Sequence, residues 1–214
     1  MKDAGVGSFI DTYVIPFVEK FKDNPYLWAI DACNEIEWVN QNEECGKIPW
    51  DRLQYLVARV AAAVHENSQV LVTMGGGAVK WNSDRFEGNF WSDSALQKQY
   101  NHPDARLDFY SLHFYGWTVK YCGNFALDKT PDDYGIGDRP CMIGENPAKG
   151  VFDDSANPKL VVLPAEMFLK SYKNGWKGLL PWTSNGVDRN GTLDDFRDGL
   201  KKFRETYPDL IEPF

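Results

Sequence analysis

Residues 25–38 of the chain read PYLWAIDACNEIEW. The short apolar run at residues 26–30 is typical of a strand that is buried on both faces, and it leads into a polar cluster at residues 34–38. Apolar residues recur at helical spacing over residues 9–21, and the proline of the following Asp-Asn-Pro sequence at residues 23–25 cannot continue a helix. This part of the chain therefore predicts a helix followed by a strand, with the pair Asn34-Glu35 at the carboxyl end of the strand.

The same alternation continues along the rest of the chain. Apolar runs with strand character lie at residues 70–74, 107–112, 140–144 and 178–182, and amphipathic helical spacing covers residues 50–65, 164–173 and 193–207. Residues 81–101 indicate a loop, and residues 117–138 indicate irregular structure with at most a short helix. Strands that alternate with helices imply a parallel sheet, so we expect an α/β protein with five parallel strands.

Composition limits the classes of partner. The chain has 214 residues, 43% of them hydrophobic, and a net charge of -8. This charge argues against nucleic acid, which needs clustered lysine and arginine, and is compatible with a neutral partner such as a sugar. The eight tryptophans and ten tyrosines fit an aromatic core and stacking platforms for sugar rings equally well. The absence of an apolar run of about eighteen residues predicts no transmembrane helix and no membrane partner.

The cysteines give no sign of a metal site. Their sequence contexts contain no CxxC or Cys/His spacing, so a zinc site is not expected, and nothing in the sequence points to an organic cofactor. Cys33 and Cys141 fall in apolar runs, where a free cysteine acts as a small hydrophobic residue. Cys45 and Cys122 lie in polar segments and could pair in an oxidising compartment; the sequence leaves this open.

Chemically able residues follow most of the predicted strands. Asn34 and Glu35 follow the first strand, His113 and Tyr115 the third, Glu145 the fourth and Trp182 the fifth. In parallel α/β architectures the reacting residues collect beyond the carboxyl ends of the strands. The two glutamates lie far apart in sequence, so they can face each other only if the sheet curves.

Two carboxyl groups in unequal environments are what the cleavage of a glycosidic bond requires. Glu145, bonded by Tyr115, would be the ionised nucleophile, and Glu35 would be the acid that protonates the leaving oxygen. Asn34 could hold the sugar 2-hydroxyl, and Trp182 would form the floor on which the sugar stacks.

Each residue also has an ordinary structural interpretation. Asn34 and Glu35 alone are most often a turn or a cap, and a lone Glu145 is usually a solvated loop residue. His113 is more often a hydrogen-bonded scaffold residue, and Trp182 alone is more often part of a core. The order of these residues along the chain and their placement at strand ends favour a catalytic site.

The chain also resembles a known family. The runs PYLWAIDACNEIEW, LDFYSLHFYGW, CMIGENPAKG and GLLPWTSNG resemble the fourth, sixth, seventh and eighth strands of glycoside hydrolase family 5 and its clan, which have a (β/α)8 TIM barrel. The resemblance implies that Glu35 is the acid/base and Glu145 the nucleophile. The expected substrate-binding residues are Asn34, Trp81, His113, Tyr115, Trp117, Trp182 and Asn185. Asn146 and Ile36 depart from the residues that commonly follow the two glutamates, which leaves the sugar open.

A full barrel of this type takes about 250 residues. Because the first motif already resembles the fourth strand, we expect residues 1–214 to form a single partial catalytic domain, without the first three βα units. We expect such a chain to expose sheet edges and to be insoluble or weakly active without its N-terminal complement.

These observations favour a retaining hydrolase of β-1,4-linked mannan or glucan. A non-catalytic glycan-binding or inactive form of such a barrel is the alternative, and an oligomerising scaffold of partial barrels is a third interpretation. The substrate class suggests a secreted or periplasmic location. The sequence leaves the oligomeric state and the choice between internal and chain-end attack undetermined.

Overall fold

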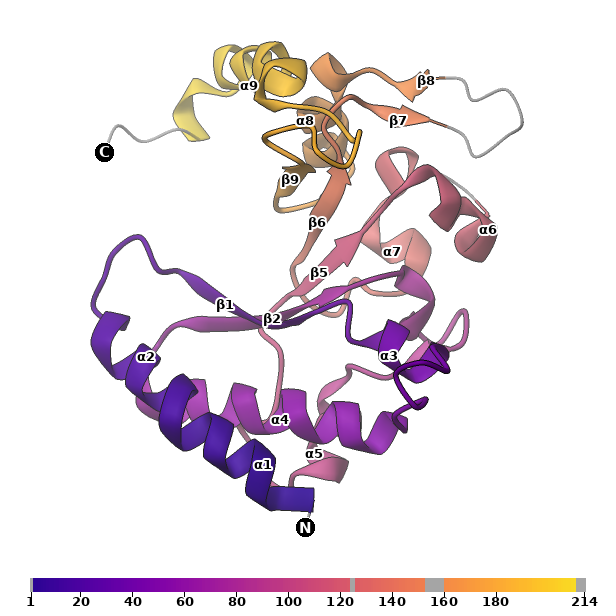
Figure 1. The fold of residues 1–214 in the computed structure, drawn as a ribbon. Coiled ribbons are helices and arrows are strands. Elements are labelled where there is room, and N and C mark those ends of the chain that lie inside the picture. Colours follow the sequence, from indigo (N-terminus) through magenta and orange to yellow (C-terminus); the bar gives the residue numbers. More distant parts are fainter. Residues whose placement is uncertain (1, 124–125, 153–159, 211–214) are drawn as a thin grey trace. The chain divides into compact units, whose positions relative to one another are not determined.

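The computed structural model describes residues 2–123, 126–152 and 160–210 (Figure 1). The chain divides into two compact units, Met1–Ser111 and Leu112–Phe214, and the division falls inside strand β5 (Tyr110–His113). β5 is the middle strand of a five-stranded sheet with the order β1-β2-β5-β6-β9. The predicted set of five parallel strands is confirmed.

Three consecutive elements form one helical segment at the start of the described chain: α1 (Lys2–Phe9), the π-helix η1 (Ile10–Val14) and α2 (Ile15–Phe21). The segment begins earlier than predicted and ends where predicted. Pro16 explains the π-helical turn, because proline has no N–H and its ring excludes the carbonyl four residues earlier. The N–H of Ile15 accordingly bonds to the carbonyl of Ile10, five residues back.

In the first unit, β1 (Ala29–Asn34) pairs in parallel with β2 (Leu71–Gly76). The prediction of a strand at residues 26–30, buried on both faces, was wrong at its start: Tyr26 and Trp28 precede the strand and are 75% and 58% exposed. The cause is a local turn. The side chain of Asn24 accepts the N–H of Tyr26 at 3.0 Å, so the chain is still in a turn at Tyr26 and enters the sheet later than expected.

The core of the first unit lies between α4 (Trp50–Asn67) and the two strands. The predicted amphipathic helix is confirmed, and Figure 1 shows α4 running along β1 and β2. The buried residues of α4 recur at helical spacing, and they pack against the buried side of β2. These core residues include Val57, Val60, Ala61, Val64, Val72 and Met74.

The predicted loop at residues 81–101 is more ordered than expected. It contains a two-stranded hairpin, β3 (Asn82–Ser83) and β4 (Gly88–Asn89), and the helix α5 (Asp93–Gln99). The hydroxyl of Ser92 caps α5 by accepting the N–H of Ala95 at 3.3 Å. Short elements of this kind carry too little periodicity to predict.

The second unit contains the strands β6 (Cys141–Pro147) and β9 (Leu179–Trp182) and the helices α8 (Pro164–Lys173) and α9 (Leu193–Thr206). Both predicted helices are confirmed. The described part of residues 117–138 has two short α-helices, α6 (Val119–Cys122) and α7 (Pro131–Tyr134), where at most one was expected.

An aromatic cluster forms the centre of the second unit. Phe114 lies against Tyr134 and Trp176, with ring centroids 5.7 and 5.5 Å apart, and all three rings are buried. The remaining elements of this unit are η3 (Gly116–Thr118), η4 (Ala126–Asp128), the hairpin strands β7 (Val151–Phe152) and β8 (Leu160–Val162), and η5 (Pro208–Leu210).

All four cysteines lie within the described residues and are free thiols. Cys141 is buried and its thiol donates to the carbonyl of Ile136, so it packs as a small hydrophobic residue, as predicted. Burial raises the pKa of the Cys141 thiol to about 12. None of the helices formed by the described residues has the length and apolar character of a membrane span.

Candidate active site

Glu35 lies in a tight turn directly after β1. Its φ of 49° falls in the left-handed region, which costs a non-glycine residue roughly 1–2 kcal/mol. The N–H of Glu35 donates to the carbonyl of Gly75 at 2.7 Å, and the carbonyl of Glu35 accepts the N–H of Trp38 at 3.2 Å. Asn34, the last residue of β1, is exposed. The backbone therefore holds Glu35 in one place at the carboxyl end of β1.

The glycines at the end of β2 make this turn possible. Gly75 donates its N–H to the carboxylate of Asp31 at 2.9 Å, besides accepting from Glu35. At Gly77, an added Cβ would lie 2.4 Å from Nε1 of Trp38. Because only a glycine leaves this space, the Gly75-Gly76-Gly77 sequence is where the turn that carries Glu35 packs against the next strand.

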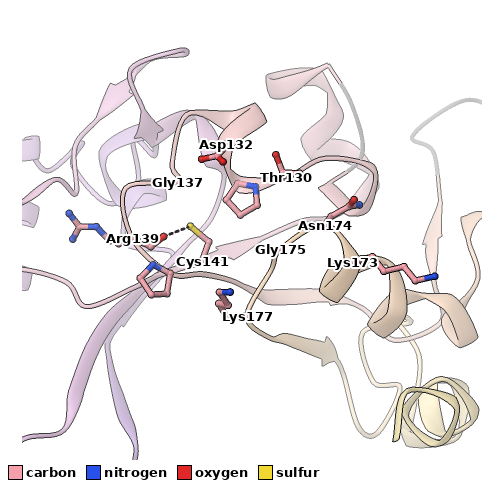
Figure 2. Close-up of a pocket in the computed structure, with 11 residues that line it drawn as sticks. Thr130, Asp132, Gly137, Arg139, Cys141, Lys173, Asn174, Gly175 and Lys177 are labelled. Carbon is pink, nitrogen blue, oxygen red and sulfur yellow. Dashed lines mark hydrogen bonds between the residues drawn. The ribbon is translucent and has the colours of Figure 1, made fainter. Parts of the chain in front are cut away.

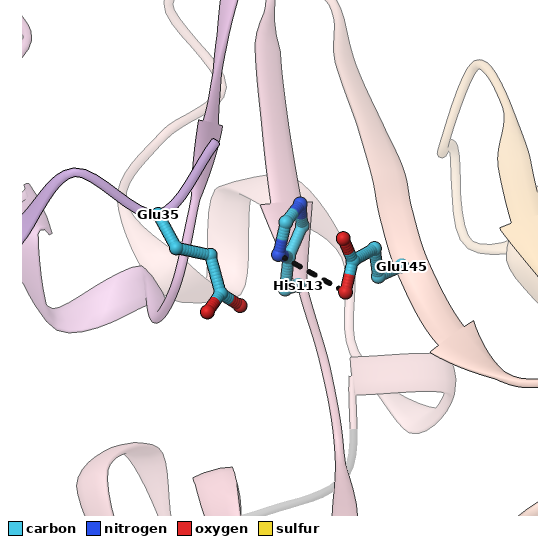
Figure 3. Close-up of side chains that lie close together, drawn as sticks. All are labelled: Glu35, His113 and Glu145. Carbon is cyan, nitrogen blue, oxygen red and sulfur yellow. Dashed lines mark ion pairs between the residues drawn. The ribbon is translucent and has the colours of Figure 1, made fainter. Parts of the chain in front are cut away.

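Glu145 lies near the carboxyl end of β6 and is nearly buried, with 9% of its surface exposed. Its Oε2 atom accepts a hydrogen bond from the hydroxyl of Tyr115 at 2.6 Å. The same oxygen lies 3.4 Å from Nδ1 of His113, which is also buried (Figure 3). The structure therefore brings together three of the predicted site residues around one carboxylate.

A backbone irregularity lies directly before Glu35 and another one includes the position of Glu145. In β6, Ile143 pairs with Leu179 and Asn146 with Pro181, so β6 has one more residue than β9 over this interval. In β1, Asp31 pairs with Thr73 and Asn34 with Gly75, again with one extra residue. Such bulges redirect side chains, and they are frequent next to active sites.

Trp182 ends β9 and pairs in register with Pro147, two residues after Glu145. It is 43% exposed, so its ring offers a surface, as a stacking floor requires. Its indole N–H donates to the carboxylate of Asp188. Desolvation opposes the ionisation of Asp188, but hydrogen bonds from Asn190 and from Trp182 outweigh it and lower the pKa of Asp188.

Two other expected substrate-binding residues lie near the surface of the second unit. Trp117 is half-buried and stacks on Tyr115, with ring centroids 6.1 Å apart and an interplanar angle of 7°. Asn185 is exposed, and its carboxamide oxygen accepts hydrogen bonds from Thr183 and from the N–H of Val187. That oxygen stabilises the turn after β9.

Trp81 was expected to bind substrate, but the structure places it in the core. It has no exposed surface, and its ring packs against Trp38 and Trp50 in the core of the first unit. Its indole N–H donates to Glu87 at 2.9 Å. A ring that is covered in this way presents no face to a sugar, so the interpretation of Trp81 as core is the correct one.

The second unit has a pocket of about 480 Å³, and Figure 2 shows residues that line it. Its lining includes Arg139, Cys141 and Lys177, which lie at or just before the amino ends of β6 and β9. Glu145 lies near the opposite end of β6. Catalytic residues of parallel α/β proteins collect at the carboxyl ends of the strands, so this pocket is not the candidate site.

Glu37 lies two residues after Glu35 in the same motif, and it was not among the predicted site residues. Glu37 begins α3 (Glu37–Gln41) and is completely buried. A carboxylate in an otherwise apolar setting is costly unless it is paired, and a second glutamate so close to the predicted acid was the available signal.

The chain was compared with known proteins in sequence and in structure. No protein-family model matches the chain. A mannan endo-1,4-β-mannosidase of Cryptopygus antarcticus is 23% identical over 224 residues, which cover 94% of this chain and 56% of that protein. The crystal structure of the β-1,4-mannanase of the same organism has a TM-score of 0.77 at 23% identity, covering 92% of this chain and 58% of the other.

A second solved structure gives the same result. The β-1,4-mannanase of the sea hare Aplysia kurodai has a TM-score of 0.74 at 24% identity, covering 93% of this chain and 59% of the other. The chain thus spans less than three fifths of the length of these relatives. The resemblance indicated by the four motifs is confirmed: the chain is similar to the cellulase- and mannanase-like members of glycoside hydrolase family 5, and it has the (β/α) barrel-type fold of β-1,4-mannanases, in part of its extent.

Proposed function

We propose that the chain carries the two catalytic carboxyl groups of a retaining endo-hydrolase of β-1,4-mannan. The observation that carries the proposal is the environment of Glu145, a nearly buried carboxylate bonded by Tyr115 and flanked by His113 at the carboxyl end of a parallel strand. The similarity to mannanases supports mannan over glucan as the substrate. A substrate of this kind favours a secreted or periplasmic location.

In the proposed mechanism Glu145 attacks the anomeric carbon while Glu35 protonates the leaving oxygen, which gives a covalent glycosyl-enzyme. Glu35, now ionised, then removes a proton from water, and the water displaces Glu145. Asn34 holds the 2-hydroxyl of the sugar, and Trp182 supports the ring by stacking. Tyr115 and His113 hold the carboxylate of Glu145 in the orientation for attack.

The test is hydrolysis of β-1,4-mannan and β-1,4-glucan, with product stereochemistry followed by proton NMR at early times. We expect release of reducing ends from mannan with the β-anomer formed first, which is the outcome of double displacement. Release of the α-anomer first would contradict retention.

The Glu145→Gln variant separates the proposal from the non-catalytic alternative. It should lose hydrolysis and keep binding of manno-oligosaccharides, measured by calorimetry. A wild-type chain that binds these oligosaccharides and cleaves none would favour the glycan-binding interpretation instead.

A further inference from the structure

Glu37 is a buried carboxylate whose two oxygens are both engaged. Oε1 accepts the indole N–H of Trp91 at 3.0 Å, and Oε2 accepts the N–H of Gly77 at a longer 3.4 Å. Trp91 has no exposed surface either. All of these residues belong to the first unit.

The position of this network matters because Glu37 directly follows the turn that holds Glu35. The N–H of Glu35 bonds to Gly75, and the carboxylate of Glu37 bonds to Gly77 and Trp91. The turn is therefore bonded to the end of β2 through Glu35, and to Gly77 and Trp91 through Glu37. A left-handed residue such as Glu35 persists only where its surroundings hold it in place.

Packing alone does not explain a carboxylate at this position. Burying a charged group costs several kcal/mol unless hydrogen bonds compensate for the lost water, and an apolar side chain would avoid that cost. Directional hydrogen bonds instead define one orientation of the chain, which is what a catalytic acid on an adjacent turn requires.

We propose that Glu37 is a positioning residue for Glu35: its hydrogen bonds to Trp91 and Gly77 set the direction in which the acid/base carboxyl group points. The inference rests on the proposed function, because it assigns Glu37 a part in the step that Glu35 catalyses. Glu37 itself donates no proton to the substrate.

The structure offers a matched control in the same unit. Glu87 also accepts an indole N–H, from Trp81 at 2.9 Å, and it accepts from Lys80 at 2.8 Å. Its side chain is 51% exposed, and these contacts join residues within the segment 80–87. The variants Glu37→Gln and Glu87→Gln therefore each weaken a glutamate–tryptophan contact, but only in the first is the glutamate itself next to the turn that carries Glu35.

The experiment compares two substrates, mannan and an aryl β-mannoside whose leaving group is a good one. Cleavage of the aryl substrate needs little protonation, so a misdirected acid should slow mannan hydrolysis much more. For Glu37→Gln we expect about a 10- to 100-fold loss of kcat on mannan and less than about 3-fold on the cleavage of the aryl bond. Trp91→Phe should show the same selectivity, and Glu87→Gln should keep wild-type values.

An independent readout uses carbon NMR of the side-chain carboxyl of Glu35, assigned by comparison with Glu35→Gln. We expect Glu37→Gln and Trp91→Phe to change the chemical shift of this carboxyl carbon at a fixed pH, because its surroundings change when the side chain points elsewhere, and Glu87→Gln to leave it unchanged. If Glu37→Gln does not fold, Trp91→Phe alone decides. Unchanged kinetics and an unchanged chemical shift, or an equal loss on both substrates, would overturn the proposal. If the wild type cleaves neither substrate, the proposed function fails, and the chemical shift still decides whether Glu37 positions Glu35.

Discussion

The two glutamates lie in different backbone settings. Glu145 lies within a strand, and side chains hold its carboxylate directly: the hydroxyl of Tyr115 at 2.6 Å and the imidazole of His113 at 3.4 Å. Glu35 lies in a left-handed turn after a strand, and main-chain hydrogen bonds hold that turn, as the one to Gly75 shows. Each strand has one extra residue, directly before Glu35 in β1 and in the interval that contains Glu145 in β6.

The difference matches the proposed roles. A nucleophile keeps one protonation state before attack, so donors that bond its carboxylate directly orient it without interfering. An acid/base group must give up a proton and take one back, so it benefits from a backbone that stays in one place through both steps. The contacts described here act on the backbone of Glu35 in the first region and on the carboxylate of Glu145 in the second.

The largest effects should come from the two carboxyl groups themselves. Glu145→Gln removes the nucleophile, and we expect loss of activity on the order of 10⁴-fold or more on every substrate. Glu35→Gln should cost about 10²- to 10⁴-fold on mannan. The measurement is initial rates on mannan and on an aryl β-mannoside with a good leaving group.

The two variants should differ in kind as well as in size. With Glu35→Gln, the aryl bond should still be cleaved in an initial burst, and added azide should speed turnover by replacing water in the second step. Azide should not restore Glu145→Gln in this way. If azide speeds turnover in Glu145→Gln and not in Glu35→Gln, then Glu145 is the acid/base and Glu35 the nucleophile.

The next effect tests the direct contact to the nucleophile. Tyr115→Phe removes the hydroxyl that donates to Oε2 of Glu145. Loss of one hydrogen bond to a charged group costs about 1.5–3 kcal/mol, so we expect kcat to fall by roughly 10- to 100-fold. Trp117→Phe is the control, because Trp117 stacks on the same tyrosine without bonding the carboxylate. Equal losses in both variants would assign the effect to packing.

Long periodic segments were predictable from the sequence, and short or locally controlled ones were not. The helices at residues 50–65 and 164–173 follow from regular apolar spacing, and the structure has them as α4 and α8. The start of β1 was placed too early because the side-chain contact of Asn24 with the backbone of Tyr26 overrides the apolar character of the run. The helix α5 depends on the cap at Ser92, a signal that covers one turn only.

The candidate site also has residues that were predictable from the sequence and residues that were not. The cluster of His113, Tyr115 and Glu145 was predictable because parallel strands bring their carboxyl ends to one edge of a sheet. Trp81 was misplaced because composition does not separate a core tryptophan from an exposed one. Glu37 was missed because its importance comes from Trp91, which is far from it in sequence and reaches it only in the folded chain.

A smaller effect compares close packing in the two units. Gly77→Ala would place a methyl group 2.4 Å from Nε1 of Trp38, and Gly199→Ala would place one 2.5 Å from the carbonyl oxygen of Pro164. Overpacking of this kind costs about 1–3 kcal/mol of the free energy of unfolding, measured by urea denaturation. We expect both variants to lose stability, but only Gly77→Ala to lower mannan hydrolysis by more than the loss of folded protein explains. A normal specific activity in Gly77→Ala would mean that Gly77 has no part in positioning Glu35.

The smallest effect is a loss of stability at low pH, and we expect it in the unit that carries Glu35. Asp108 accepts hydrogen bonds from His65 of α4 at 2.8 Å and from the N–H of Val72 in β2 at 2.7 Å. Burial opposes ionisation of Asp108, but these hydrogen bonds and one from Arg106 outweigh it and lower its pKa. A lowered folded-state pKa adds stability above the unfolded value of about 4, and that stability is lost as the pH falls through the folded-state value.

The difference in the free energy of unfolding between wild type and Asp108→Asn should therefore be full above about pH 5 and shrink below about pH 4. Asp188→Asn is the matched control, because the pKa of Asp188 is also lowered, but the residue is exposed and belongs to the second unit. Hydrogen exchange should show the backbone of α4 and β2 losing protection in acid before α8 and α9 do. The reverse order would mean that Asp108 does not set the acid sensitivity of the unit that holds Glu35.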